Sequence, residues 1–180
     1  MHLRVFSIFV SIILLIISCK QEVAEPEDIG YEYFPLKQGH WISYQVDSIV
    51  HDAALNVHNH FSYQVKELVD SSFIDNEGET AFRIERFKRP DESFPWTLSD
   101  VWSTKRNNAR AERVEENVRT VRLAFPAREG KSWDYNAENT NDIWESEIVT
   151  TNASFSVEGN DFDDVCEVSI INQRLSLIHI

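Results

Sequence analysis

Apolar and polar residues alternate along most of the chain after residue 40, and this two-residue period predicts β-strands rather than helices. Residues 41–50 show it clearly, because Ile42, Tyr44 and Val46 fall on one face while polar side chains fall on the other. Eight strands are expected in all, the first over 41–50 and the others over 61–69, 80–88, 96–105, 109–116, 118–123, 143–150 and 165–172.

Turn residues separate these runs at short spacing. Asp75 to Gly78 is a turn signal inside a predicted β-hairpin over 58–88, and a second hairpin is expected to turn at Glu116-Asn117. Strands joined so closely favour antiparallel meander pairing. We therefore predict an all-β domain over residues 31–174, built as a strongly curled sheet or an incomplete up-and-down barrel. No helix is expected apart from one in the N-terminal segment.

The first 18 residues have the pattern of a bacterial lipoprotein signal peptide. Arg4 provides the positive charge, and the apolar run from Val5 to Ile17 is too short to span a bilayer core of about 30 Å. The run ends in a small residue, Ser18, followed by Cys19, whose thiol would take the lipid. Cleavage is expected between Ser18 and Cys19. The alternatives are a single transmembrane anchor and an ordinary signal peptide with a chance cysteine.

Lipid on Cys19 would attach the protein to a membrane without a spanning helix, because two or more acyl chains anchor a protein stably. Lys20 follows the cysteine, and the absence of aspartate there favours the outer membrane. Residues 19–30 are acidic and lack an apolar pattern, so they are expected to form a solvated tether. Whether the domain faces the periplasm or the cell surface is left open.

The last six residues, 175–180, match the translation of a common transposon-end sequencing adapter. This match predicts that they are adapter-derived and that the natural chain continues past Arg174. The alternative is a genuine short apolar strand, which their composition permits.

Composition narrows the classes of function. A formal net charge of −13 argues against binding to nucleic acid, which requires clustered cations. The chain has two cysteines, and if Cys19 carries lipid then Cys166 has no disulfide partner. Cys166 lies in an apolar run and is expected to be an inert buried thiol. The chain contains no Gly-Xaa-Ser-Xaa-Gly elbow, P-loop or dinucleotide fingerprint, so we expect neither an enzyme nor a cofactor.

Three groups of residues have metal-ligating chemistry, but none is predicted to bind a metal. His58 and His60 share a strand face, with His51 placed across a hairpin, yet zinc requires a third protein ligand. The acidic runs 161–164 and 75–79 offer oxygen ligands without the spacing of a calcium loop. Both acidic runs are expected to be solvated turns.

Five tryptophans are the strongest candidates for a binding role. If the curled sheet brings them together, they would line a ligand pocket or stack on sugars, and otherwise they fill the core. They are Trp41, Trp96, Trp102, Trp133 and Trp144.

Aromatic and turn residues recur between residues 31 and 174, namely Phe34, Pro35, Leu36, Gly39, Trp41, Tyr44, Asn117, Leu123, Ala124, Phe125, Pro126, Trp133 and Asn136. Together they resemble a family of uncharacterised lipoproteins typical of Bacteroidetes-type bacteria. The resemblance implies a β-rich domain that continues into a further segment, and it carries over no catalytic residues.

The sequence thus favours a lipid-anchored cell-envelope protein with a non-catalytic binding or accessory role. The alternative is a carrier that holds an apolar ligand, such as a lipid, in a half-open barrel. In either case the lipid on Cys19 would attach the protein to the membrane. Whether the domain also binds a protein, a lipid or a glycan is left open. A continuous apolar cavity would favour the carrier, and a packed interior with exposed aromatics would favour the accessory role.

Overall fold

The computed structural model describes residues 28–52, 57–172 and 175–179. The signal segment 1–18, Cys19 and most of the tether lie outside the described residues, so the expectations placed on them stay predictions. Within the described ranges, no helix has the length and apolar character needed to cross a membrane. The helical structure described there is one short 3-10 turn, η1 (Tyr31–Tyr33).

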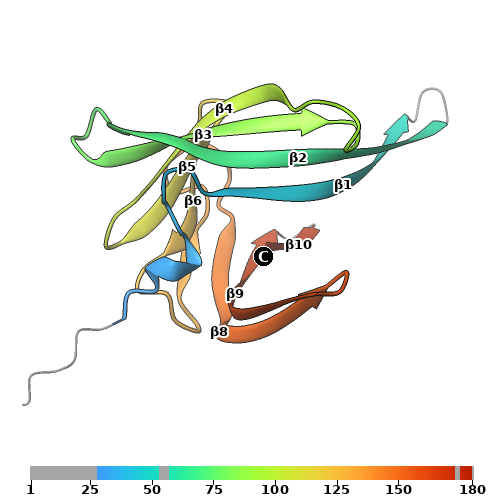
Figure 1. The fold of residues 1–180 in the computed structure, drawn as a ribbon. Coiled ribbons are helices and arrows are strands. Elements are labelled where there is room, and N and C mark those ends of the chain that lie inside the picture. Colours follow the sequence, from blue (N-terminus) through green and yellow to red (C-terminus); the bar gives the residue numbers. More distant parts are fainter. Residues whose placement is uncertain (1–27, 53–56, 173–174, 180) are drawn as a thin grey trace, which may run out of the picture.

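Two antiparallel sheets make up the described chain, which confirms the all-β class and the meander (Figure 1). The first sheet has its strands in chain order and curls into a half-barrel: β1 (Trp41–Asp52), β2 (Val57–Ile74), β3 (Thr80–Arg89), β4 (Thr97–Arg106), β5 (Arg110–Glu115) and β6 (Val118–Ala124). The second sheet has the order β10-β9-β8-β7, with β7 (Ser132–Asp134), β8 (Glu145–Val157), β9 (Asn160–Asn172) and β10 (Leu175–His179). The origin of residues 175–180 stays a prediction.

The β1–β2 hairpin is longer than the strand beside it. β1 pairs with β2 over its whole length, from Trp41 opposite Leu68 to Asp52 opposite Val57. β3, in contrast, reaches along β2 only as far as the pair of Arg89 with Gln64. Residues 46–52 and 57–63 therefore project as a two-stranded ribbon, called here the β1–β2 arm (Figure 1).

The β8–β9 hairpin is longer than the sequence pattern predicts. The strands expected at 143–150 and 165–172 extend to Val157 and back to Asn160, and the hairpin turns at Glu158 and Gly159, with φ of 49° and 79°. The acidic run 161–164 is exposed, as expected, but the prediction that it forms a turn is wrong, because it belongs to β9. Register shifts along β8 interrupt the alternation that reveals a strand.

The predicted turn between β5 and β6 is confirmed. Glu116 and Asn117 connect the strands with φ of 48° and 64°, the left-handed values that a tight two-residue hairpin requires. Asparagine tolerates that conformation better than most residues. Most of the charged run 109–116 is therefore a strand, β5, although its composition also suits a helix.

A small apolar cluster joins the two sheets. Its buried members come from β5, β6, β8 and β9 and from the residue after β6: Ala111, Leu123, Phe125, Ile148, Val168 and Ile170. Trp133 and Trp144 pack against it, and Tyr31 of η1 meets Phe125 edge-on at 5.1 Å between ring centroids. Burial of these apolar side chains fixes the second sheet and the N-terminal segment against one end of the half-barrel.

Candidate functional site

A cleft lies between the inner face of the half-barrel, the N-terminal segment 33–36 and the second sheet. It consists of two cavities of about 320 and 240 Å³ that share four lining residues, Tyr33, Phe34, Tyr44 and Arg113. The larger cavity is bounded by β1, β2, β3 and the segment 33–36, and the smaller by β6 and β9. Its volume places the larger cavity at the lower end of the range for small-molecule sites, about 300–1,000 Å³.

The wall of the larger cavity is apolar and open. Trp41, Ile42 and Tyr44 keep 64%, 51% and 43% of their surface exposed. Phe34, Pro35 and Leu36 of the N-terminal segment also line this cavity. Single exposed hydrophobic residues are common on protein surfaces, but a group that lines one cavity offers a continuous surface to an apolar molecule.

The floor of the cleft carries charged side chains. Arg113 pairs through Nη1 with Glu67 at 3.2 Å and with Glu115 at 3.5 Å, and Glu115 also forms an ion pair with Nη2 of Arg122 at 2.6 Å. Beyond the cleft, Glu67 continues this chain of ion pairs to Arg86 at 3.7 Å. Each charge is offset by a neighbour of opposite sign, which is how partly buried charges are retained in a folded protein.

Several buried nitrogen donors in and beside the cleft have no hydrogen-bond acceptor among the described residues. The Nε atoms of Arg113 and Arg122 belong to residues that line the cleft, and Nε of Arg86 and the indole Nε1 of Trp102 lie beyond it. The guanidinium groups of Arg86 and Arg113 lie over the Trp102 ring, at 5.0 and 5.8 Å from its centroid. A buried donor without an acceptor is costly, so each such group marks a place where a ligand oxygen or a water would be stabilised.

Tyr44 lines both cavities and adds a polar group to the apolar wall. Burial raises the pKa of its hydroxyl above the usual value, and the nearby carboxylate of Glu67 raises that pKa further. The hydroxyl therefore stays protonated at neutral pH and is able to donate a hydrogen bond.

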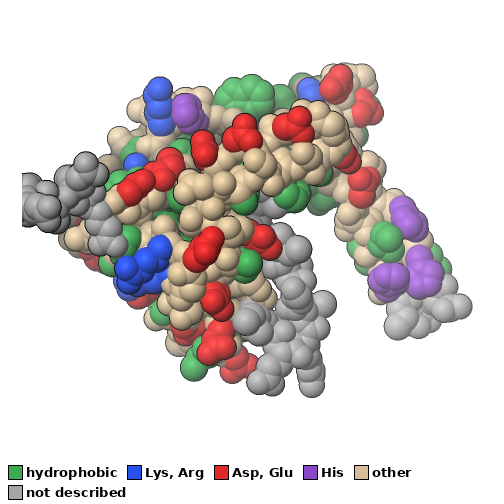
Figure 2. Space-filling view, turned by 90° about the horizontal axis from the view of Figure 1, so that it is seen from below, with side chains coloured by type: hydrophobic (Ala, Val, Ile, Leu, Met, Phe, Trp, Pro, Cys, Tyr) green, Lys and Arg blue, Asp and Glu red, His purple; other side chains and the backbone are tan. Residues whose placement is uncertain are grey.

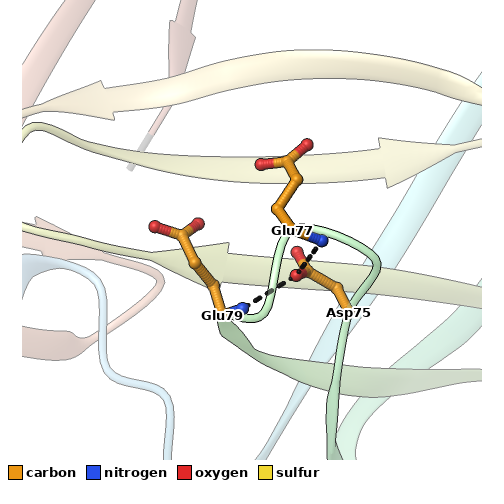
Figure 3. A group of neighbouring side chains, drawn as sticks. All are labelled: Asp75, Glu77 and Glu79. Carbon is orange, nitrogen blue, oxygen red and sulfur yellow. Dashed lines mark hydrogen bonds between the residues drawn. The ribbon is translucent and has the colours of Figure 1, made fainter.

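The acidic turn 75–79 is a turn, as expected, but it holds a buried lysine rather than facing only water. The Lys105 ammonium, with 7% of its side chain exposed, lies 2.8 Å from Asp75, 2.6 Å from Glu77 and 2.8 Å from Glu79. Figure 3 shows the three carboxylates on the turn, with Asp75 accepting hydrogen bonds from the backbone of Glu77 and Glu79.

These contacts shift the pKa values of Lys105 and of the three carboxylates. Hydrogen bonds from Lys105 are the main cause that lowers the pKa of all three carboxylates. Burial alone would lower the pKa of Lys105, but its hydrogen bonds to the carboxylates outweigh burial and raise it. The carboxylate oxygens of Asp75, Glu77 and Glu79 lie close enough together to hold a hard metal cation. The Lys105 ammonium lies against all three carboxylates, where such a cation would bind.

Three histidines, His51, His58 and His60, lie on the β1–β2 arm, and Figure 2 shows a group of histidine side chains at one end of the molecule. His51 is opposite His58, with ring centroids 4.5 Å apart, and His60 follows on the same face two residues later. Within the described ranges these imidazoles do not group with a third ligand at metal-binding distance. The hairpin placement of His51 is therefore confirmed, and a third zinc ligand is not found among those residues.

Cys166 lies on β9 and lines the smaller cavity. It is half-buried and has no disulfide partner in the described part of the chain. Burial raises the pKa of its thiol to about 11, so at neutral pH it is a thiol rather than a nucleophilic thiolate.

The five tryptophans do not converge on one pocket. Trp41 lines the larger cavity, and Trp102 lies beneath two arginines. Trp96 is covered by Arg89 at 4.2 Å and by Lys66 at 5.3 Å.

The remaining two belong to the core. Trp133 donates through Nε1 to the Val121 carbonyl at 2.9 Å, and Trp144 stacks on Tyr135 at 5.8 Å between ring centroids. The ligand-facing role predicted for the tryptophans therefore stays a prediction, and its geometric support is strongest for Trp41.

The residues that line the cleft floor were not predicted from the sequence. Arg113 and Arg122 occur in strands where charged residues are expected on the wet face, so their positions alone gave no sign of a cleft. Tyr44 was placed on the apolar face of its strand, and this is the face that lines the cleft. A comparison of the chain with models of known protein families, with curated proteins and with solved structures finds no significant match.

Proposed function

We propose that this chain is an exported, lipid-anchored cell-envelope protein whose β-domain binds an apolar ligand in the cleft. The observation that carries the proposal is the open apolar wall of the larger cavity, formed by the start of β1 and the segment 33–36. A packed interior would have favoured an accessory protein, whereas an open cavity of this size supports the carrier.

A binding role suits the polar groups of the cleft better than a catalytic one. Glu67, the carboxylate that lines the larger cavity, is held by Arg113 and Arg86. A carboxylate fixed between two guanidinium groups is held in one orientation, which suits a positioning role. We propose that these groups orient a ligand.

A titration with N-phenyl-1-naphthylamine, an uncharged apolar dye that fluoresces when it is removed from water, tests the proposal. Ile42→Glu places a carboxylate on the cavity wall and should weaken dye binding at least about tenfold, or about 1.4 kcal/mol. Ile49→Glu is the matched control, since Ile49 lies on the same strand with 53% exposure, against 51% for Ile42, but on the opposite face. Equal affinities in both variants, or no binding by the unmodified protein, would refute the proposal.

The membrane attachment is tested separately at Cys19. Metabolic labelling with an alkyne-tagged fatty acid should label the unmodified protein and should fail for Cys19→Ser. Labelling of that variant, or recovery of the unmodified protein without lipid in the soluble fraction, would contradict a lipid anchor.

A second candidate function is binding to a protein partner along β1. β1 is an edge strand of the first sheet, and Ile49 and Val50 keep about half of their surface exposed (53% and 49%). An edge of this kind accepts a strand from another protein by backbone hydrogen bonding. A photo-crosslinking amino acid at position 49 should capture such a partner in intact cells, and the absence of any adduct would exclude this candidate.

A further inference from the structure

A β-bulge brings Arg122 into the cleft. In the β5–β6 pairing, Ala111 is opposite Leu123 and Glu112 is opposite Val121, so Arg122 is the extra residue on β6. Consecutive residues of a regular strand point to opposite faces, yet Arg122 and Leu123 both line the smaller cavity. Bulges redirect side chains in this way and are frequent beside binding sites. The bulge therefore adds a second guanidinium to a cavity that Arg113 already lines.

The two arginines keep donors free for a ligand. Both ion pairs of Arg113 are made by Nη1, and the pair of Arg122 with Glu115 is made by Nη2. The Nε atoms of both arginines are buried and have no acceptor within the described part of the chain. A guanidinium has five donors, and Nε with Nη2 forms a fork that matches a carboxylate or a phosphate. The ion pairs of Arg113 leave this fork unused, whereas in Arg122 Nη2 is engaged by Glu115 and Nε remains.

The polar floor adjoins the apolar wall. Tyr44 and Arg113 line both cavities, so an elongated molecule that runs from one cavity to the other would pass both. Its apolar part would contact Ile42 and Phe34 in the larger cavity, and its end would reach Arg113 and Arg122 in the smaller one. Such an arrangement favours a molecule that is apolar along its length and negative at one end.

We propose that the ligand of the cleft is an amphiphile with an acidic head group, bound by Arg113 and Arg122 with the Tyr44 hydroxyl as a third donor. This inference rests on the proposed function, because it specifies the ligand of the same cleft. Glu67 and Glu115 are already paired with these arginines, so the acidic head would be held by the donors that those pairs leave over. The shared chemistry is a carboxylate or phosphate oxygen attached to a long hydrocarbon chain.

Competition against bound N-phenyl-1-naphthylamine separates the head group from the tail. Palmitic acid, hexadecyl phosphate and 1-hexadecanol have tails of equal length and differ in the head. We expect the acid or the phosphate to displace the dye at least about tenfold more strongly than the alcohol. The stronger of the two charged ligands then identifies the head group. Equal displacement by all three would overturn the acidic head while leaving the apolar-ligand function intact, whereas failure of the dye itself to bind would overturn both.

Variants then test the two arginines. Arg122→Gln and Arg113→Gln should each remove most of the preference for the charged ligands, with little change in the affinity for 1-hexadecanol. Arg86→Gln is the matched control, because Arg86 shares the ion pairs and has a buried Nε without an acceptor but lines neither cavity. A preference that survives in Arg122→Gln and Arg113→Gln, or that falls equally in Arg86→Gln, would overturn the assignment. Thermal unfolding of each variant confirms that it is folded.

Discussion

Lys105 provides the sharpest test of what stabilises the half-barrel. Lys105→Met keeps the length and apolar stem of the side chain but removes the ammonium that Asp75, Glu77 and Glu79 surround at 2.6–2.8 Å. Removal of one partner from a buried ion pair typically costs about 3–5 kcal/mol. Glu77 and Glu79 are 54% and 39% exposed, which lets water replace part of the loss. We therefore expect the free energy of unfolding to fall by about 3 kcal/mol, the lower end of that range.

Urea unfolding followed by tryptophan fluorescence measures this change. Lys37→Met is the control, because it removes one positive charge at an exposed position. It should change the free energy of unfolding by less than about 0.5 kcal/mol. A loss in Lys105→Met no larger than in the control would show that the three ion pairs do not stabilise the fold.

The pH dependence of the same difference gives a second readout. The pKa of each carboxylate is lowered in the folded protein, so its contribution is present above the ordinary carboxyl pKa of about 4 and is lost as the pH falls through the lowered value. That contribution is missing in Lys105→Met. The difference between the two proteins should therefore shrink below about pH 4, and a difference that stays constant from neutral to strongly acidic pH would refute the reasoning.

Three further predictions concern packing, reactivity and backbone conformation. Ile148 is fully buried in the core cluster, so Ile148→Ala should lower the free energy of unfolding by about 3 kcal/mol, measured against Val149→Ala at an exposed position of the same strand. Because burial raises the pKa of the Cys166 thiol to about 11, iodoacetamide should alkylate the folded protein much more slowly than the urea-unfolded one at pH 8, and equal rates would contradict that placement. Gly30 has φ of 79°, and a Cβ added there would lie 2.6 Å from the Ala127 side chain. Gly39 has a similar φ of 85°, but a Cβ added there would have no atom within 4 Å. Gly30→Ala should therefore lower the melting temperature more than Gly39→Ala.

The alternation of apolar and polar residues predicted the strands of the first sheet, although β2 runs from Val57 to Ile74 and is longer than the expected 61–69. It identified β1 through Ile42 and Tyr44, and the Glu116-Asn117 pair identified the two-residue hairpin between β5 and β6. These signals are local, because each depends on residues a few positions apart. The same rule failed over 151–164, where register shifts along β8 and the acidic residues of β9 hide a continuous hairpin.

The candidate site was less predictable than the fold, and the reason is geometric. Arg122 faces the cleft because β6 contains one residue more than its partner at that point, and the sequence of β6 does not mark the bulge. Arg113 and Glu67 are distant in the chain and meet at 3.2 Å only after the sheet has curled. The tryptophans, in contrast, were conspicuous in the sequence but lie on separate elements.

The β1–β2 arm is expected to be less rigid than the rest of the first sheet. Its residues 57–63 pair with β1 alone, whereas residues 64–68 of β2 lie between β1 and β3. Amides of the arm should therefore exchange with solvent through local fraying, at a lower free energy than the amides near Val65, which is 1% exposed. β1 also lines the cleft through Trp41 and Ile42, which pair with Leu68 and Glu67 in the protected part of the sheet, so the arm is able to fray while this wall of the cleft keeps its shape. The most easily opened part of the first sheet is therefore separate from the cleft, and local opening of the arm would leave the shape of the cleft unchanged.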